Sequence, residues 1–109
     1  MNTFCYAIVT SLLLLISTQT RANIDDVPLP NEFEVRMAME DKFPMIISGF
    51  TKLSIDEVMA FYDEKLGQPE YITDDIGRYT YFYNINGKKV KIGFYQQDDW
   101  CELSIMMTE

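Results

Sequence analysis

The chain has 109 residues, a formal charge of −8, no histidine and two cysteines. This length suits one small domain. The negative charge argues against nucleic acid and anionic membranes as partners, because both bind positive surfaces. The lack of histidine removes the usual general base and metal ligand at neutral pH.

Residues 1–22 have the layout of a secretory signal peptide. The apolar run at residues 4–16 is too short to span a membrane, and a polar stretch follows it. Thr20 and Ala22 occupy the small-residue positions that precede a cleavage site. No Lys or Arg precedes the apolar run, so an uncleaved anchor is the alternative. The segment predicts an exported protein, without membrane contact after cleavage.

Cleavage would leave about 87 residues and change the formal charge from −8 to −9, because Arg21 is lost. Cys101 would then be the one remaining cysteine, so no internal disulfide could form. A domain of this size must therefore be held together by burial of apolar side chains.

The segment at residues 23–32 is predicted to be an extended leader. Pro28 and Pro30 forbid a helix and disfavour a central strand. We expect the leader to run along the surface of the domain at residues 33–109, with Val27 and Leu29 as anchors.

A β-hairpin is predicted to begin this domain. Apolar and polar residues alternate at 33–40, which indicates a half-buried strand. The apolar set of this strand is Phe33, Val35, Met37 and Met39. A turn at 41–44 leads to a second strand at 45–51, in which Gly49 indicates a bulge or a close backbone approach.

Residues 53–69 carry the signals of one amphipathic helix. Ser54 and Glu57 have the spacing of a capping box, and Gly67 with Pro69 can end the helix. The apolar positions form one stripe at the helical period, so the helix should cover one sheet face. They are Ile55, Val58, Met59, Tyr62 and Leu66.

Four further strands are predicted after the helix, at residues 70–74, 78–85, 88–95 and 100–108. Asn86-Gly87 between two alternating runs predicts a tight hairpin that pairs Ile85 with Lys88 and Tyr81 with Ile92. The helix-facing set is Tyr79, Tyr81, Tyr83, Ile85, Val90, Ile92, Phe94, Cys101, Leu103, Ile105 and Met107. The fold class is therefore two-layer α+β, with one α-helix on an antiparallel sheet of five to six strands in the order β-β-α-β-β-β-β.

No catalytic or metal motif stands out. Cys101 is expected to be buried and inert, with an intermolecular disulfide or catalysis as the alternatives. The pairs Asp25-Asp26, Asp74-Asp75 and Asp98-Asp99 are expected to be solvated turns, although carboxylates can also bind calcium or act as acid and base. We predict no catalytic residue, no cofactor and no metal.

The face turned away from the helix carries the strongest functional hint. Aromatic and basic residues gather there, namely Phe82, Lys89, Lys91, Tyr95 and Trp100. Lysines can simply protect a solvated strand, whereas aromatic residues beside cations are favoured at protein interfaces. A second helix, a dimer partner or the leader could each cover this surface.

The run at residues 49–66 (GFTKLSIDEVMAFYDEKL), with its Pro-x-Pro leader and its Asn-Gly hairpin, resembles small bacterial periplasmic proteins and lipoproteins of unknown function. The resemblance implies a location in the Gram-negative envelope. It transfers no active residues, and the lipid-attachment motif of the lipidated members is absent from this sequence.

These observations predict a non-enzymatic protein-binding or accessory module that binds a protein partner or a second copy of itself. The alternative is an immunity or inhibitor protein that neutralises a basic toxin or enzyme in the periplasm, which would suit the acidic composition. A small-molecule enzyme is a more distant third class and would require a deep pocket with converging polar groups.

Overall fold

The computed structural model describes residues 23–109, so the predicted signal peptide lies outside the described residues. A short 3-10 helix, η1 (Ile24–Asp26), precedes one α-helix, α2 (Ile55–Leu66), and six strands. The strands are β1 (Glu34–Met39), β2 (Met45–Thr51), β3 (Tyr71–Asp75), β4 (Arg78–Ile85), β5 (Lys88–Gln97) and β6 (Trp100–Thr108).

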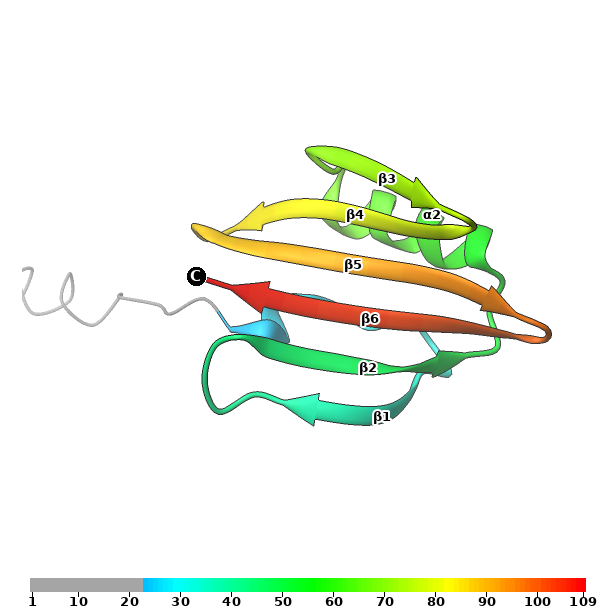
Figure 1. Cartoon of the computed structure of the whole chain (residues 1–109), viewed down its shortest axis with the longest axis horizontal. Helices are drawn as coiled ribbons and strands as arrows, with labels where there is room; N and C mark the ends of the chain where they lie inside the picture. The colour runs from blue at the N-terminus through cyan, green and yellow to red at the C-terminus, as the bar shows by residue number, and fades with distance from the viewer. Residues whose placement is uncertain (1–22) are drawn as a thin grey trace, which may run out of the picture.

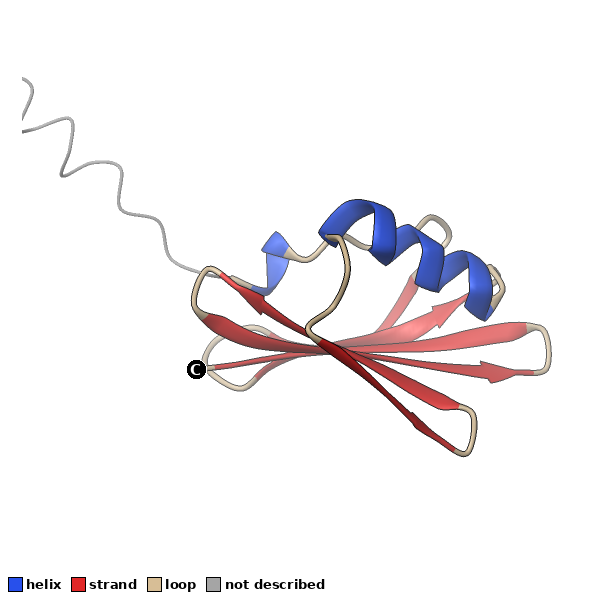
Figure 2. Cartoon of the chain, turned by 90° about the horizontal axis from the view of Figure 1, so that it is seen from above, coloured by secondary structure: helices blue, strands red, loops and turns tan. Residues whose placement is uncertain are grey.

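All six strands form one antiparallel sheet in the order β1-β2-β6-β5-β4-β3 (Figure 1). The β1–β2 hairpin forms one edge, and α2 then carries the chain to the far edge, where β3 begins. The meander from β3 to β6 returns until β6 pairs with β2. Figure 2 shows α2 and η1 on one side of the sheet and no element on the other. The α+β class with one helix and a six-stranded antiparallel sheet is thus confirmed.

Helix α2 begins and ends near the predicted signals. The Ser54 hydroxyl accepts from the backbone N–H of Glu57 at 3.2 Å, which satisfies one free donor of the first turn. The capping box differs from the prediction, because the Glu57 carboxylate accepts the Ser54 hydroxyl proton and not the Ser54 backbone N–H. Gly67 ends the helix with a φ of 79°, in the left-handed region that favours glycine.

The predicted register of the meander is confirmed by the structure. Asn86 and Gly87 both have positive φ, and Ile85 pairs with Lys88 across them. The rest of this hairpin follows in step, so alternate residues face α2 and form the core. The buried residues of β4, β5 and β6 are Tyr81, Tyr83, Val90, Ile92, Phe94, Cys101, Leu103, Ile105 and Met107.

The leader lies along the domain as predicted, with Val27 as a buried anchor, but it is not extended throughout, because Ile24–Asp26 form η1 and help to cover the core. Ile24 and Val27 are buried, whereas the predicted anchor Leu29 is 40% exposed. The Tyr62 hydroxyl of α2 donates to the Pro28 carbonyl at 2.7 Å and fixes the leader beside the helix. The Thr51 hydroxyl also donates to the Asn31 carbonyl at 3.1 Å, and such contacts between distant segments produce no periodic sequence signal.

The prediction that the first strand is half-buried is wrong, because every residue of β1 is exposed. A bulge between Val35 and Met37 reverses the alternation, so Met37 and Met39 face away from the core. Val35 stays on the core side but is 48% exposed, since β1 is an edge strand. The predicted close approach at Gly49 is confirmed, because a Cβ there would overlap the Glu34 carbonyl oxygen.

Candidate interaction face

The sheet surface opposite α2 and the leader, which we call the outer face, is not covered by any element within residues 23–109 (Figure 2). Cross-strand partners share a face and successive residues alternate, so the pairing assigns each side chain to one side. The residues of the outer face include the half-buried and exposed ones that alternate with the core residues of β4, β5 and β6.

The side chains of the outer face form rows that cross the strands. The central row consists of Met37, Ser48, Ser104, Gly93, Thr80 and Thr73. One flanking row consists of Met39, Ile46, Met106, Lys91, Phe82 and Tyr71, and the other of Glu34, Phe50, Glu102 and Tyr95. Small side chains in the central row therefore lie between two rows of larger ones.

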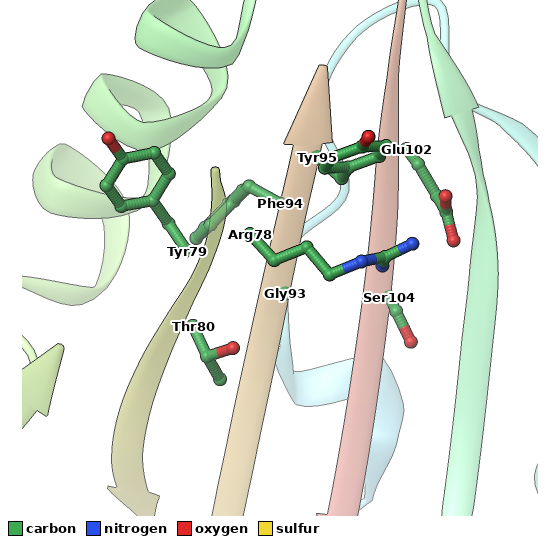
Figure 3. A pocket seen from close by; sticks show the side chains of 8 residues that line it. All are labelled: Arg78, Tyr79, Thr80, Gly93, Phe94, Tyr95, Glu102 and Ser104. Carbon is green, nitrogen blue, oxygen red and sulfur yellow. The ribbon is translucent and has the colours of Figure 1, made fainter. Parts of the chain in front are cut away.

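The centre of the outer face is hollowed at Gly93. Gly93, Thr80 and Ser104 line a hollow of about 70 Å³ together with Arg78, Tyr95 and Glu102 (Figure 3). Figure 3 shows the Arg78 side chain extending across β5 toward β6 beside the Tyr95 ring, with Thr80 and Ser104 along the floor. The small residues from Ser48 to Thr73 thus form a strip between larger side chains, which we call the trough, and its hollow at Gly93 is crossed by Arg78.

The glycine at position 93 is not required by the backbone. Its φ does not lie in the left-handed region, and a Cβ there would have only the Ser104 carbonyl oxygen nearby, at 3.9 Å. Glycine in a strand interior weakens the strand and often marks a place where a ligand or another backbone approaches closely. Gly93 thus leaves open a space that the fold itself could fill.

Four aromatic rings of the outer face each carry a cation above them. Arg78 lies 4.3 Å from the centre of the Tyr95 ring, and Lys91 lies 5.8 Å from that of Phe82. The same arrangement joins Arg36 to Phe50 at 5.6 Å and Lys52 to Trp100 at 5.5 Å. These distances are in the range of cation–π attraction, which restrains the long basic side chains while their heads stay exposed.

Charge is divided unequally between the two sides of the sheet. The outer face has five basic and four acidic residues, so its net charge is +1 although residues 23–109 total −9. They are Arg36, Lys52, Arg78, Lys89 and Lys91 against Glu34, Asp75, Asp98 and Glu102. The leader and α2 have seven acidic residues and only Lys65 as a base.

The structure places all five predicted contact residues on the outer face, but it does not gather them. Phe82 and Lys91 are direct cross-strand partners, and Lys89 lies two residues from Lys91. They line a hollow of about 550 Å³ with Tyr71, whose ring stacks on Phe82 at 4.2 Å. Tyr95 lies across the trough from this group.

Trp100 lies at the far end of β6 from the Phe82 group, where it pairs with Gln97. Sequence reasoning missed Arg36 and Phe50, which line a hollow of about 250 Å³ with Trp100. The alternation of Phe50 with Ser48 and Ile46 was the available signal. It was ambiguous because residues 45–47 are all apolar.

Among residues 23–109, the thiol of Cys101 and the carboxyl of Glu40 are the groups outside the tyrosines whose pKa is shifted. Cys101 is fully buried, as predicted, and this burial raises the pKa of its thiol. Hydrogen bonding with Asp25 raises the pKa of the exposed Glu40 carboxyl, so these two acids meet although they are distant in sequence. Within residues 23–109 no three His, Cys, Asp or Glu residues lie close enough together to hold a metal ion.

Comparison with family models, curated proteins and solved structures finds no match to this chain. Within the part that the structure describes, no helix has both the length and the apolar character needed to cross a membrane. The function must therefore be argued from the outer face itself.

Proposed function

We propose that this chain is a small, secreted or periplasmic, non-enzymatic module that binds another protein through its outer face. The observation that carries the proposal is the open trough at Gly93, where the fold tolerates a side chain and has none. Aromatic residues and arginine, which are enriched at interface hot spots, lie on both sides of it.

The chemistry of the remaining groups supports a binding role over an enzymatic one. Cys101, a possible nucleophile, is buried with a raised pKa. The hydroxyls of Thr80 and Ser104 have no histidine to activate them, because the chain contains none. The outer face offers rings, cations and hydroxyls, which are the groups that bind a surface rather than transform a substrate.

The first experiment uses the purified mature protein and an unbiased library of displayed peptides. Peptides selected on the wild type are mapped by amide chemical shifts and then tested against Gly93→Val and against the pair Phe82→Ser and Trp100→Ser. We expect the shifts to cluster on the outer face and binding to weaken in both variants. Glu64→Ser, on the exposed side of α2, is the matched control and should bind like the wild type.

Self-association is examined alongside by light scattering with and without reductant. A dimer that persists in reductant and dissociates in Gly93→Val would show that a second copy occupies the outer face. Selected peptides that map elsewhere, together with a monomer that the variants do not change, would refute the proposed use of this face.

The immunity or inhibitor function remains the second candidate, and the charge of the helix layer favours it. Seven acidic residues on the leader and α2 form a surface that suits a basic enzyme or toxin. Replacement of Asp56 and Glu57 by Asn and Gln distinguishes the two functions. Loss of binding to a basic partner in that variant, with Gly93→Val unaffected, would establish this second candidate.

A further inference from the structure

We infer that the outer face docks an acidic polypeptide segment that lies across the strands, along the central row. This inference rests on the proposed function and names the chemistry of the partner. Three independent observations carry it: the charge of the face, the arrangement of its cations, and the size and composition of the trough.

The charge distribution selects an acidic partner and orients it. The outer face is net positive at +1, while the rest of residues 23–109 contributes −10 to the total of −9. An acidic segment is repelled by α2 and the leader and attracted to the opposite side of the sheet, so it meets the protein in one orientation. A basic partner would be drawn to the helix layer instead.

The cations flank the trough in positions suited to carboxylates on both sides of a bound chain. Lys91 belongs to one flanking row, and Arg78 and Arg36 lie beside the other, over Tyr95 and Phe50. Each of these residues is exposed and its stem is held by an aromatic ring, and the Arg36 guanidinium already pairs with the Glu34 carboxylate at 3.9 Å. A carboxylate that binds there forms charge-assisted hydrogen bonds at little entropic cost.

The central row has the length of one polypeptide segment, and its hollow at Gly93 is about 70 Å³. Six strands about 4.8 Å apart make the central row about 24 Å long, and flanking rows four residues apart lie about 13 Å from each other. An α-helix is about 10–12 Å wide, and about 16 helical residues span that length. The floor of Ser48, Ser104, Gly93 and Thr80 allows close approach and supplies hydroxyls for hydrogen bonds.

The composition of the flanking rows favours a peptide over a phosphate or sulfate polymer. Glu102 and Glu34 lie among the cations and would face any uniformly charged polyanion. Half-buried Met106 and Ile46 offer apolar contact that a polypeptide can use and a highly charged chain cannot. The outer face therefore presents both charged and apolar side chains, which suits a polypeptide whose own side chains are partly acidic and partly apolar.

The test starts from the peptides that map to the outer face in the display selection. We expect them to be enriched in Asp and Glu over the input library and to bind more weakly at high salt. Arg78→Glu and Lys91→Glu should each weaken binding by about tenfold or more, which corresponds to the loss of one charge-assisted hydrogen bond. Lys42→Glu and Lys65→Glu change the net charge equally but lie off the outer face, so they should bind as the wild type does.

Each other outcome overturns the inference in a distinct way. Outer-face peptides without acidic enrichment would refute the acidic partner and leave the proposed function intact. Dextran sulfate that displaces the peptides and binds the outer face more tightly would assign the face to a polyanion. Salt-sensitive growth in mass that Arg78→Glu abolishes is the one exception, because it would support the inference and identify the acidic segment as α2 of a second copy. Peptides that map only elsewhere would refute the proposed function as well.

Discussion

The substitution Gly93→Val tests whether the glycine is needed for the stability of the fold or for contact with a partner at the outer face. A Cβ at position 93 meets only the Ser104 carbonyl oxygen, at 3.9 Å, so it fits without a clash, and the valine methyl groups enter the hollow that Arg78 also lines. Removing a glycine from a strand interior is worth about 0.5–1 kcal/mol. Valine also has a higher strand preference on a scale that spans about 1 kcal/mol. We therefore expect Gly93→Val to raise the free energy of unfolding by about 1 kcal/mol, or Tm by about 4–8 °C.

The assay is denaturant unfolding followed by circular dichroism, with Gly49→Ala as the matched control. Gly49 lies on the core face of β2, where a Cβ would overlap the Glu34 carbonyl and lie 2.9 Å from the Phe33 ring. This overpacking should lower stability by about 1–3 kcal/mol. If Gly93→Val is instead less stable than the wild type, the fold itself requires this glycine and the trough no longer points to a partner.

The remaining predictions concern buried groups. Tyr62→Phe removes the 2.7 Å hydrogen bond to the Pro28 carbonyl and should cost about 1–3 kcal/mol in a denaturant titration; an unchanged midpoint would show that the leader is not held there. Cys101 should react with a thiol reagent only as the protein unfolds, because it is fully buried; fast labelling of the native protein would contradict the packing. Burial raises the pKa of Tyr83 from 10.0 to about 12, so its contribution to stability should be full below pH 10 and lost as the pH rises through about 12. The unfolding midpoint should fall over that range more steeply in the wild type than in Tyr83→Phe, and equal slopes would refute the assignment.

The parts of the fold that the sequence predicted well depend on local geometry. Asn86-Gly87 determines the pairing of β4 with β5, because both residues adopt the positive φ of a two-residue turn. Once that register is set, strict alternation assigns every side chain of these strands to a face. The same logic correctly placed Cys101 in the core and Trp100 on the outer face.

The parts that escaped prediction depend on contacts between distant segments. The bulge after Val35 turns Met37 and Met39 to the outer face. No residue type in β1 indicates in the sequence that a bulge occurs there. The pairing of β6 with β2 places Ser104 beside Ser48, although 56 positions separate them in the sequence. The central row therefore becomes visible only when the strand order is known.

Net charge and surface charge lead to different expectations for this protein. The total of −8 suggests a basic partner, and that reasoning treats the surface as uniform. Five of the basic residues nevertheless lie on one face: the register of β4 and β5 places Arg78, Lys89 and Lys91 there, and Arg36 and Lys52 lie over outer-face rings. A small acidic protein built in this way has one surface that favours basic partners and another that favours acidic partners. The position at which a partner binds, and not its affinity alone, is therefore the measurement that reveals its function.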